Sequence, residues 1–221
     1  MLEGIEAQRL LHMTAHEKRW LNNVKKALYE SDRALQSGLP EDRCLEELFK
    51  GVDTAKTLRR SLRGEDTSPR DHKKRFIEFL ALEIPCAGQG GSTFPLVDAR
   101  RRRNVAYSFG EIVYEIRCMI HENENLNAAE DVDYHILLDW SVRNPQFYAQ
   151  VCDGMSVFNG YFLWNRLREV LSKFITGIEG MIASAEGRPW FISCRPDLGS
   201  IAPASQRSKK AAWPRPPAAR H

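Results

Sequence analysis

The segment from Asn159 to Ile182 constrains the fold more strongly than any other part of the chain. Its apolar side chains recur every three or four positions for about five turns, the spacing of one helix face. They are Leu163, Leu167, Val170, Leu171, Phe174, Ile178, Met181 and Ile182. Asn159 suits the N-cap, because its side chain can accept a hydrogen bond from the first turn. So long an apolar face must be covered by other elements, so the chain must fold as packed layers.

Four further segments show helical signals. Residues 5–35 contain few helix breakers and predict one long helix or two shorter ones. Pro40, followed by two acidic residues, suits the first turn of a helix that runs to about residue 62. Residues 69–84 and 107–121 repeat the helical spacing over shorter lengths. The sequence therefore predicts several helices around a common core.

Residues 134–158 follow a different pattern. The segments 134–140 and 147–152 are rich in aromatic and β-branched residues, and Asp153-Gly154 is a tight-turn dipeptide. We therefore predict a small antiparallel β-hairpin insertion at about 134–158. The predicted fold is mainly α, a helical bundle with this hairpin, in a single domain of residues 1–187.

The end of the chain is predicted to lie outside that domain. From Arg188 onward, seven Lys or Arg residues stand against one acidic residue, whereas the whole chain has a net charge of only +3. Residues 188–221 form a basic, Pro/Ala-rich tail, and we expect disorder beyond residue 199 because this composition cannot build a core. Such a tail is either a solubilising end or a segment that attracts nucleic acid or an acidic partner.

Composition excludes several classes of protein. Apolar residues make up 43% of the chain, and no apolar run approaches the roughly 18 to 20 residues that cross a bilayer. Residues 1–11 lack the pattern of a secretion signal. The five cysteines are odd in number and widely spaced, unlike a disulfide framework or a zinc site. We expect a cytoplasmic protein with no membrane segment and no metal or other cofactor.

Residues 86–106 predict an irregular segment, since they contain several glycines and Pro95. The glycines do not form a phosphate-binding P-loop, which needs a preceding strand and a Gly-Lys-Ser/Thr ending. A run of four arginines follows: Arg100, Arg101, Arg102 and Arg103. These side chains are candidates for contact with RNA phosphates, although such a run is also typical of a solvated loop.

The predicted helix 107–121 has a second stripe beside its apolar face. Gly110, Tyr114, Arg117 and His121 lie along this stripe, so the last two residues stand one turn apart and face the same way. Arginine binds phosphate through two parallel hydrogen bonds, and histidine transfers protons near neutral pH. Tyr114 adds a ring on which a base can stack. The structural alternative is that cations in the last turn complement the helix dipole.

The stretch from Ile112 to Glu122, with its arginine followed by a histidine on an apolar helix, resembles the signature of HEPN domains. The resemblance implies a helical bundle that dimerises so that the Arg and His of both chains line one cleft. It also implies metal-independent ribonuclease activity, with Arg117 as the phosphate-binding cation and His121 as the general acid or base. Three residues separate Arg117 from His121, a shorter gap than is usual in the family.

Our leading hypothesis is a HEPN-like homodimer that binds RNA and cleaves it without metal, with an antitoxin as a conceivable protein partner. Gly110 and Tyr114 are the residues expected at the dimer interface. One alternative is a non-catalytic helical module for interaction or oligomerisation. The other is an enzyme that uses a metal held by the acidic residues Glu122, Glu124, Glu130, Asp131 and Asp133. The sequence leaves open whether the protein is an enzyme.

Overall fold

A computed structural model describes residues 4–83, 93–98, 103–123, 136–140, 148–152 and 155–187. The chain divides into one unit spanning Met1–Trp190 and another spanning Phe191–His221, and all described residues belong to the first. Its helices are α1 (Ala7–Leu11), α2 (Ala15–Gln36), α3 (Glu41–Leu62), α4 (His72–Glu83), α5 (Phe109–Asn123) and α6 (Gly160–Ala185). The prediction of a mainly helical fold is confirmed.

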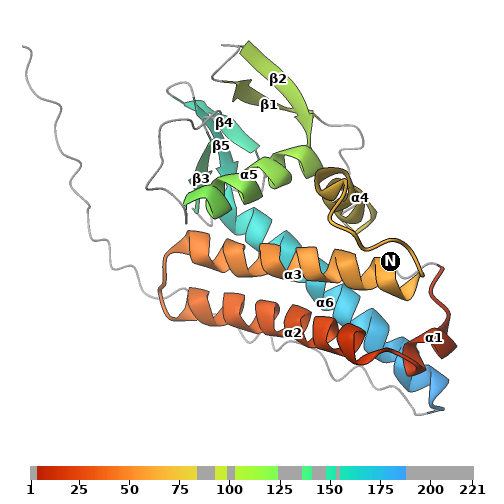
Figure 1. Cartoon of the computed structure of the whole chain (residues 1–221). Helices are drawn as coiled ribbons and strands as arrows, with labels where there is room; N and C mark the ends of the chain where they lie inside the picture. The colour runs from red at the N-terminus through yellow and green to blue at the C-terminus, as the bar shows by residue number, and fades with distance from the viewer. Residues whose placement is uncertain are drawn as a thin grey trace, which may run out of the picture. The chain divides into compact units, whose positions relative to one another are not determined.

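The predicted N-terminal helix is divided in two at Thr14. The Thr14 hydroxyl accepts a hydrogen bond from the Glu17 backbone N–H, and the Glu17 carboxylate accepts one from the Thr14 N–H at 2.8 Å. This capping box starts α2 and leaves α1 as a separate short helix. After α2, Gly38 adopts a positive φ of 66° and Pro40 leads directly into α3. The two long helices therefore lie side by side (Figure 1).

Helix α3 lies at the centre of the core, between α2 and α6. Its side chains Leu48, Phe49 and Val52 are fully buried. Gly51 permits the closest approach to α6, because an added Cβ would lie 2.6 Å from the Leu171 side chain. The cap predicted for α6 is also present, since the Asn159 side chain accepts a hydrogen bond from the Phe162 N–H at 2.8 Å. Helices α4 and α5 cover the opposite side of α3 (Figure 1).

The strands form two small sheets. In the first, β1 (Thr93–Asp98) and β2 (Arg103–Ser108) pair in an antiparallel manner. The prediction that residues 86–106 are irregular is therefore partly wrong, because β1 and most of β2 lie within them. The alternation that pairs Phe94 with Tyr107 and Leu96 with Val105 is a strand signal that Pro95 and the arginine run obscure.

The second sheet differs from the simple hairpin predicted at 134–158. Its strands are β3 (Ile136–Asp139), β4 (Tyr148–Cys152) and β5 (Met155–Asn159), in the order β3-β5-β4. Strand β5 takes the centre and pairs with β3 in parallel and with β4 in antiparallel orientation. The hairpin prediction is thus not confirmed. A parallel pair requires a longer connection than a tight turn, and that connection runs through β4.

Two further expectations concern the C-terminal tail and membrane-spanning helices. The predicted tail, residues 188–221, lies outside the described residues. Among the described helices, none combines the length and the apolar composition needed to cross a membrane.

Candidate functional site

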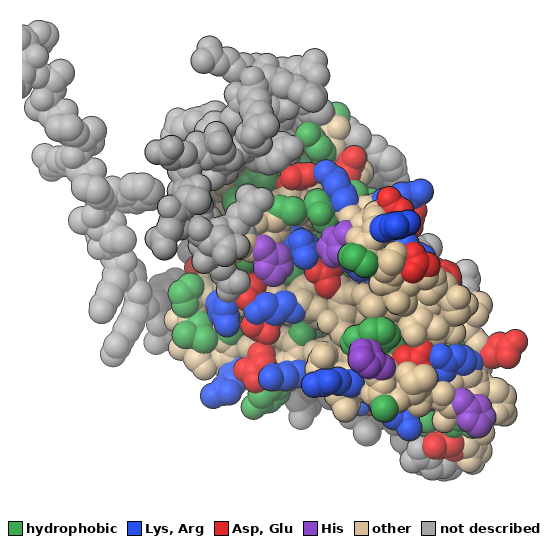
Figure 2. Space-filling view, viewed as in Figure 1, with side chains coloured by type: hydrophobic (Ala, Val, Ile, Leu, Met, Phe, Trp, Pro, Cys, Tyr) green, Lys and Arg blue, Asp and Glu red, His purple; other side chains and the backbone are tan. Residues whose placement is uncertain are grey.

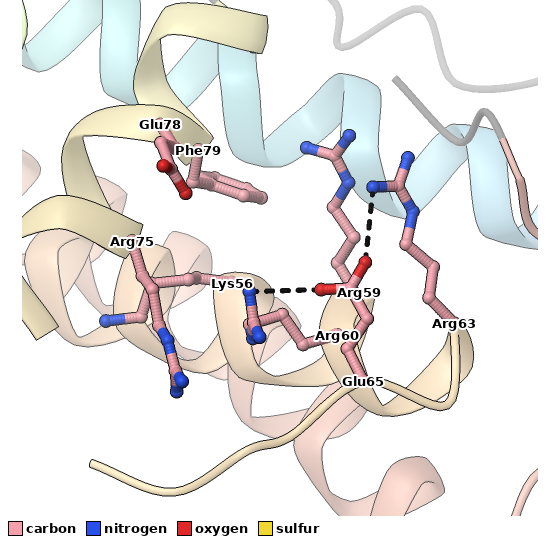
Figure 3. A pocket seen from close by; sticks show the side chains of 8 residues that line it. All are labelled: Lys56, Arg59, Arg60, Arg63, Glu65, Arg75, Glu78 and Phe79. Carbon is pink, nitrogen blue, oxygen red and sulfur yellow. Dashed lines mark ion pairs between the residues drawn. The ribbon is translucent and has the colours of Figure 1, made fainter. Parts of the chain in front are cut away.

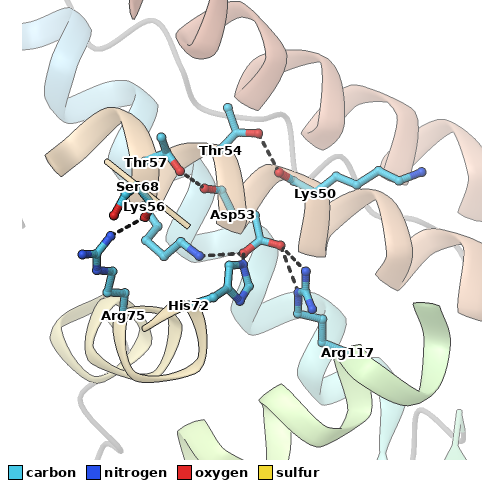
Figure 4. Close-up of polar contacts among 9 residues, drawn as sticks. All are labelled: Lys50, Asp53, Thr54, Lys56, Thr57, Ser68, His72, Arg75 and Arg117. Carbon is cyan, nitrogen blue, oxygen red and sulfur yellow. Dashed lines mark hydrogen bonds and ion pairs between the residues drawn. The ribbon is translucent and has the colours of Figure 1, made fainter. Parts of the chain in front are cut away.

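Asp53, in the middle of α3, is the centre of a polar cluster. Its Oδ2 accepts two hydrogen bonds from Arg117 of α5, from Nε at 2.9 Å and from Nη2 at 2.7 Å. Its Oδ1 lies 3.0 Å from Lys56 Nζ and 3.0 Å from His72 Nε2 (Figure 4). Helices α3, α4 and α5 thus bring one carboxylate, two basic side chains and one imidazole together. We call these four residues the Asp53 cluster.

Apolar packing on each helix sets the positions of these polar groups. Asp53 follows the fully buried Val52 and stands at the edge of the core, with 21% of its side chain exposed. Arg117 follows the buried Ile116 on α5 in the same way. His72 is the first residue of α4 and comes directly after Asp71, whose backbone has a positive φ of 57°. Burial of the apolar faces therefore directs the polar edges of the three helices toward one another.

The charges in the Asp53 cluster shift the proton affinities of its members. Burial acts to raise the pKa of Asp53, but the charges of Lys56 and Arg117 and their hydrogen bonds outweigh it and lower that pKa. Burial is also the largest influence on Lys56 and His72, and it lowers the pKa of both side chains despite the nearby Asp53 carboxylate. Asp53 therefore stays ionised at neutral pH, while the neutral form of His72 is favoured.

Aromatic rings lie beside the cluster. The rings of Phe76 and Tyr114 meet edge to face, with centroids 5.6 Å apart. The Arg117 guanidinium lies over both rings, 5.8 Å from each centroid. Lys73 Nζ lies 5.2 Å from the Tyr114 ring and also pairs with Glu115 at 2.6 Å. Tyr114 is thus half-buried between two cations, an arrangement typical of cation–π contacts.

A pocket of about 240 Å³ opens between α3 and the start of α4, next to the cluster. We call it the α3–α4 pocket. Its lining includes Lys56, Thr57, Arg60, Ser68, His72 and Arg75. A second pocket of about 180 Å³ shares three of the cations and extends toward Arg59 and Arg63 (Figure 3). On the visible face, histidine and Lys/Arg side chains gather where α3, α4 and α5 meet (Figure 2).

The structure brings together only some of the residues expected at a site. Arg117 belongs to the Asp53 cluster and Tyr114 lies beside it, whereas His121 lies one turn further along α5 and is partly exposed. Arg100, Arg101 and Arg102 lie outside the described residues. Arg103 begins β2, and its side chain is likewise outside them.

The role expected for Gly110 at a dimer interface is wrong. Gly110 is buried, and a Cβ added to it would lie 3.0 Å from Ile77 Cγ2 of α4 in the same chain. Tyr114 likewise contacts His72 and Phe76 of α4. Sequence patterns show which face of α5 is close-packed, but they do not show whether the packing partner belongs to the same chain.

Sequence reasoning missed Asp53, Lys56 and His72. Asp53 and Lys56 share one edge of α3 at a spacing of three, which is the only local signal. His72 showed no partner in the sequence, because Asp53 and Arg117 belong to other helices. Contacts over such separations follow from helix packing and leave no trace in local spacing.

The metal alternative has no support among the described residues. No group of three or more His, Cys, Asp or Glu side chains in the described part of the chain is placed to hold a metal ion. Most of the acidic stretch proposed for a metal lies outside that part. Cys44 is a buried free thiol, and Cys118 is a partly exposed one.

Comparison with known proteins identifies no relative of this chain. No protein-family model, curated protein or solved structure matches this chain. The resemblance to HEPN domains therefore rests on the residues of α5 alone.

Proposed function

We propose that this chain is a HEPN-like protein that binds RNA on the face where α3, α4 and α5 meet. The observation that carries the proposal is the Asp53 cluster, in which one carboxylate orients Arg117 beside Lys56, His72 and the ring of Tyr114. Cations beside a ring suit a nucleic-acid strand, because they meet its phosphates while the ring stacks on a base.

We extend this proposal to metal-independent cleavage of the RNA backbone. In this step the 2′-hydroxyl of the RNA attacks the neighbouring phosphorus, and the bond from phosphorus to the 5′-oxygen breaks. Arg117 stabilises the charge that develops on the phosphate, and His121 either takes the proton of the 2′-hydroxyl or gives one to the leaving 5′-oxygen. The two hydrogen bonds from Arg117 to Asp53 leave further N–H donors on its guanidinium for a phosphate oxygen. A cation held in place before the substrate arrives needs little reorganisation during the reaction.

Mixed RNAs incubated with the purified protein, with and without EDTA, test this extension. We expect cleavage that persists in EDTA and falls about 10²-fold or more in His121→Ala. Arg117→Ala should reduce it to a similar extent. Arg33→Gln is the control, because Arg33 is 65% exposed and lies on α2. Activity that disappears in EDTA would contradict the metal-independent mechanism.

The second proposal is a non-catalytic helical module for interaction or oligomerisation. It is favoured by the pairing of Arg117 with Asp53, since a neutralised and largely buried cation is also what a structural role requires. Under this proposal, Arg117→Ala lowers the melting temperature, and no variant or wild-type protein cleaves RNA. Fluorescence anisotropy with labelled RNA then separates a binding module from one that recognises only protein.

The homodimer remains a proposal that follows from the HEPN resemblance. Because Gly110 is buried against Ile77 of the same chain, we propose a dimer whose interface does not include Gly110. Sedimentation at tens of micromolar tests it directly, and a monomer at that concentration would exclude it. A protein partner such as an antitoxin is proposed on the same resemblance.

A further inference from the structure

The α3–α4 pocket is lined by several basic side chains. Lys56 is almost fully buried, with 7% of its side chain exposed, and Arg75 has 13% of its side chain exposed. Arg60, one turn beyond Lys56 on α3, lines the same pocket. Holding cations together away from water is costly unless negative charge is nearby. Asp53 is the only acidic residue in the pocket lining and lies 3.0 Å from Lys56, while Glu65 and Asp66, outside that lining, pair with Arg60 and Arg75 at 3.0 and 3.2 Å.

The start of α4 brings further basic side chains to the pocket. The first four residues of the helix are His72, Lys73, Lys74 and Arg75, and its first turn holds no acidic residue. The positive end of the helix dipole and its free backbone N–H groups also lie at this end. Basic side chains here oppose the dipole, so the local sequence is unfavourable for the helix alone. An anion bound beside this turn would offset this unfavourable interaction with the dipole.

The loop between α3 and α4 is held in one conformation by its own hydrogen bonds. Asp66 accepts hydrogen bonds from the Ser68 N–H at 2.8 Å and from the Ser68 hydroxyl at 2.6 Å. Arg75 binds the Ser68 carbonyl at 2.5 Å, and Arg60 binds the Asp66 carbonyl at 2.8 Å. The wall of the pocket is therefore formed before any ligand arrives, which lowers the cost of binding.

The two arginines keep donors for a ligand. Arg60 uses Nε for the loop carbonyl and Nη1 for Glu65 at 3.0 Å, and Arg75 uses its two terminal nitrogens for Ser68 and Asp66. Each guanidinium carries five N–H donors, so these contacts occupy only part of the set. Thr57 also lines the pocket, with its hydroxyl donating to the Asp53 backbone carbonyl at 2.9 Å. Multiple cationic donors around a small pocket match the several acceptor oxygens of a phosphate.

We propose that the α3–α4 pocket binds a phosphate group through Lys56, Arg60 and Arg75. The identity of the ligand rests on the proposed function, in which this phosphate belongs to the backbone of the bound RNA. The second pocket supports a strand over a free phosphate, because it carries the cationic lining from Lys56 to the partly exposed Arg63, about 10 Å along α3. Neighbouring phosphates of one strand can follow that surface.

Fluorescence anisotropy with a short single-stranded RNA over a range of salt concentrations tests the proposal. Arg60→Gln should weaken RNA binding about 10-fold, as expected for losing a charge-assisted hydrogen bond. It should also reduce the salt dependence by about one phosphate contact. Arg33→Gln on α2 removes the same charge from another surface and should leave affinity nearly unchanged. Equal losses in both variants would overturn the pocket assignment in favour of a general charge effect.

A measurement on the wild-type protein guards against variants that fail to fold. Titration with inorganic phosphate, followed by amide NMR, should shift the N–H signals of Ser68, His72 and Lys73. RNA should compete for the same site. If phosphate binds there but RNA does not bind, the RNA function fails and the phosphate pocket stands. If RNA binds while neither Arg60→Gln nor phosphate affects it, the pocket assignment fails and the RNA function stands.

Discussion

At the scale of single residues, Asp53 holds the basic side chains around it in position. Without a carboxylate at this position, Arg117 and the largely buried Lys56 would be uncompensated cations on a helix interface. With it, both basic side chains have an anionic partner in a fixed position, and His72 gains a partner at 3.0 Å. The chemistry expected of Arg117 therefore depends on a residue 64 positions away in the chain.

His72 gives the residue-scale prediction, which concerns pH. Burial lowers its pKa below the ordinary value of 6.5, so the unfolded chain binds a proton more readily than the folded one. The stabilisation from neutral His72 is therefore complete above about pH 6.5 and declines as the pH falls below that value. Asp53 stays ionised in this window, because its own pKa is lowered.

Thermal melts of wild type and His72→Gln between pH 5 and 7.5 check this prediction. The wild-type melting temperature should fall more steeply toward pH 5 than that of the variant, because the glutamine side chain does not bind a proton in this pH range. Parallel profiles for the two proteins would show that His72 does not titrate differently in the folded and unfolded states.

At the scale of elements, caps and breakers explain where the helices begin. Helix α1 ends at Leu11 and Thr14 caps the start of α2, although the apolar spacing alone allows a continuous helix over residues 5–35. Its capping box satisfies backbone N–H groups that would otherwise lack a partner at the start of α2. The Glu17 carboxylate also binds Arg9 at 2.5 Å and Ser61 at 2.7 Å, so the cap is tied to α1 and α3.

Thr14→Ala should destabilise the protein by about 1 kcal/mol, the usual cost of losing an N-cap side chain. Thr14→Ser keeps the hydroxyl and serves as the matched control, with a change well below that value. Urea unfolding monitored by circular dichroism measures both. An alanine variant as stable as the serine variant would mean that the Glu17 contacts alone define the start of α2.

At the scale of the whole molecule, the C-terminal tail is separable in composition from the helical unit. Deleting residues 200–221 should leave the melting temperature within a few degrees of wild type, since a Pro/Ala/Ser-rich segment offers few groups to a core. If the tail assists RNA binding, its loss should also flatten the salt dependence of affinity, because fewer counterions are released. A larger drop in melting temperature would show that the tail packs on the folded unit.

The sequence by itself determined the helices, because an apolar face with a period of 3.6 residues and a capping residue are local properties. The α6 segment and its Asn159 cap are examples, and the predicted 107–121 segment matches α5 within two residues at each end. Tertiary structure alone decided the pairing of β3 with β5, the packing of Gly110 on Ile77, and the meeting of Arg117 with Asp53. Each of these joins segments far apart in the chain, and their arrangement follows from burying all the apolar faces together rather than from any local pattern.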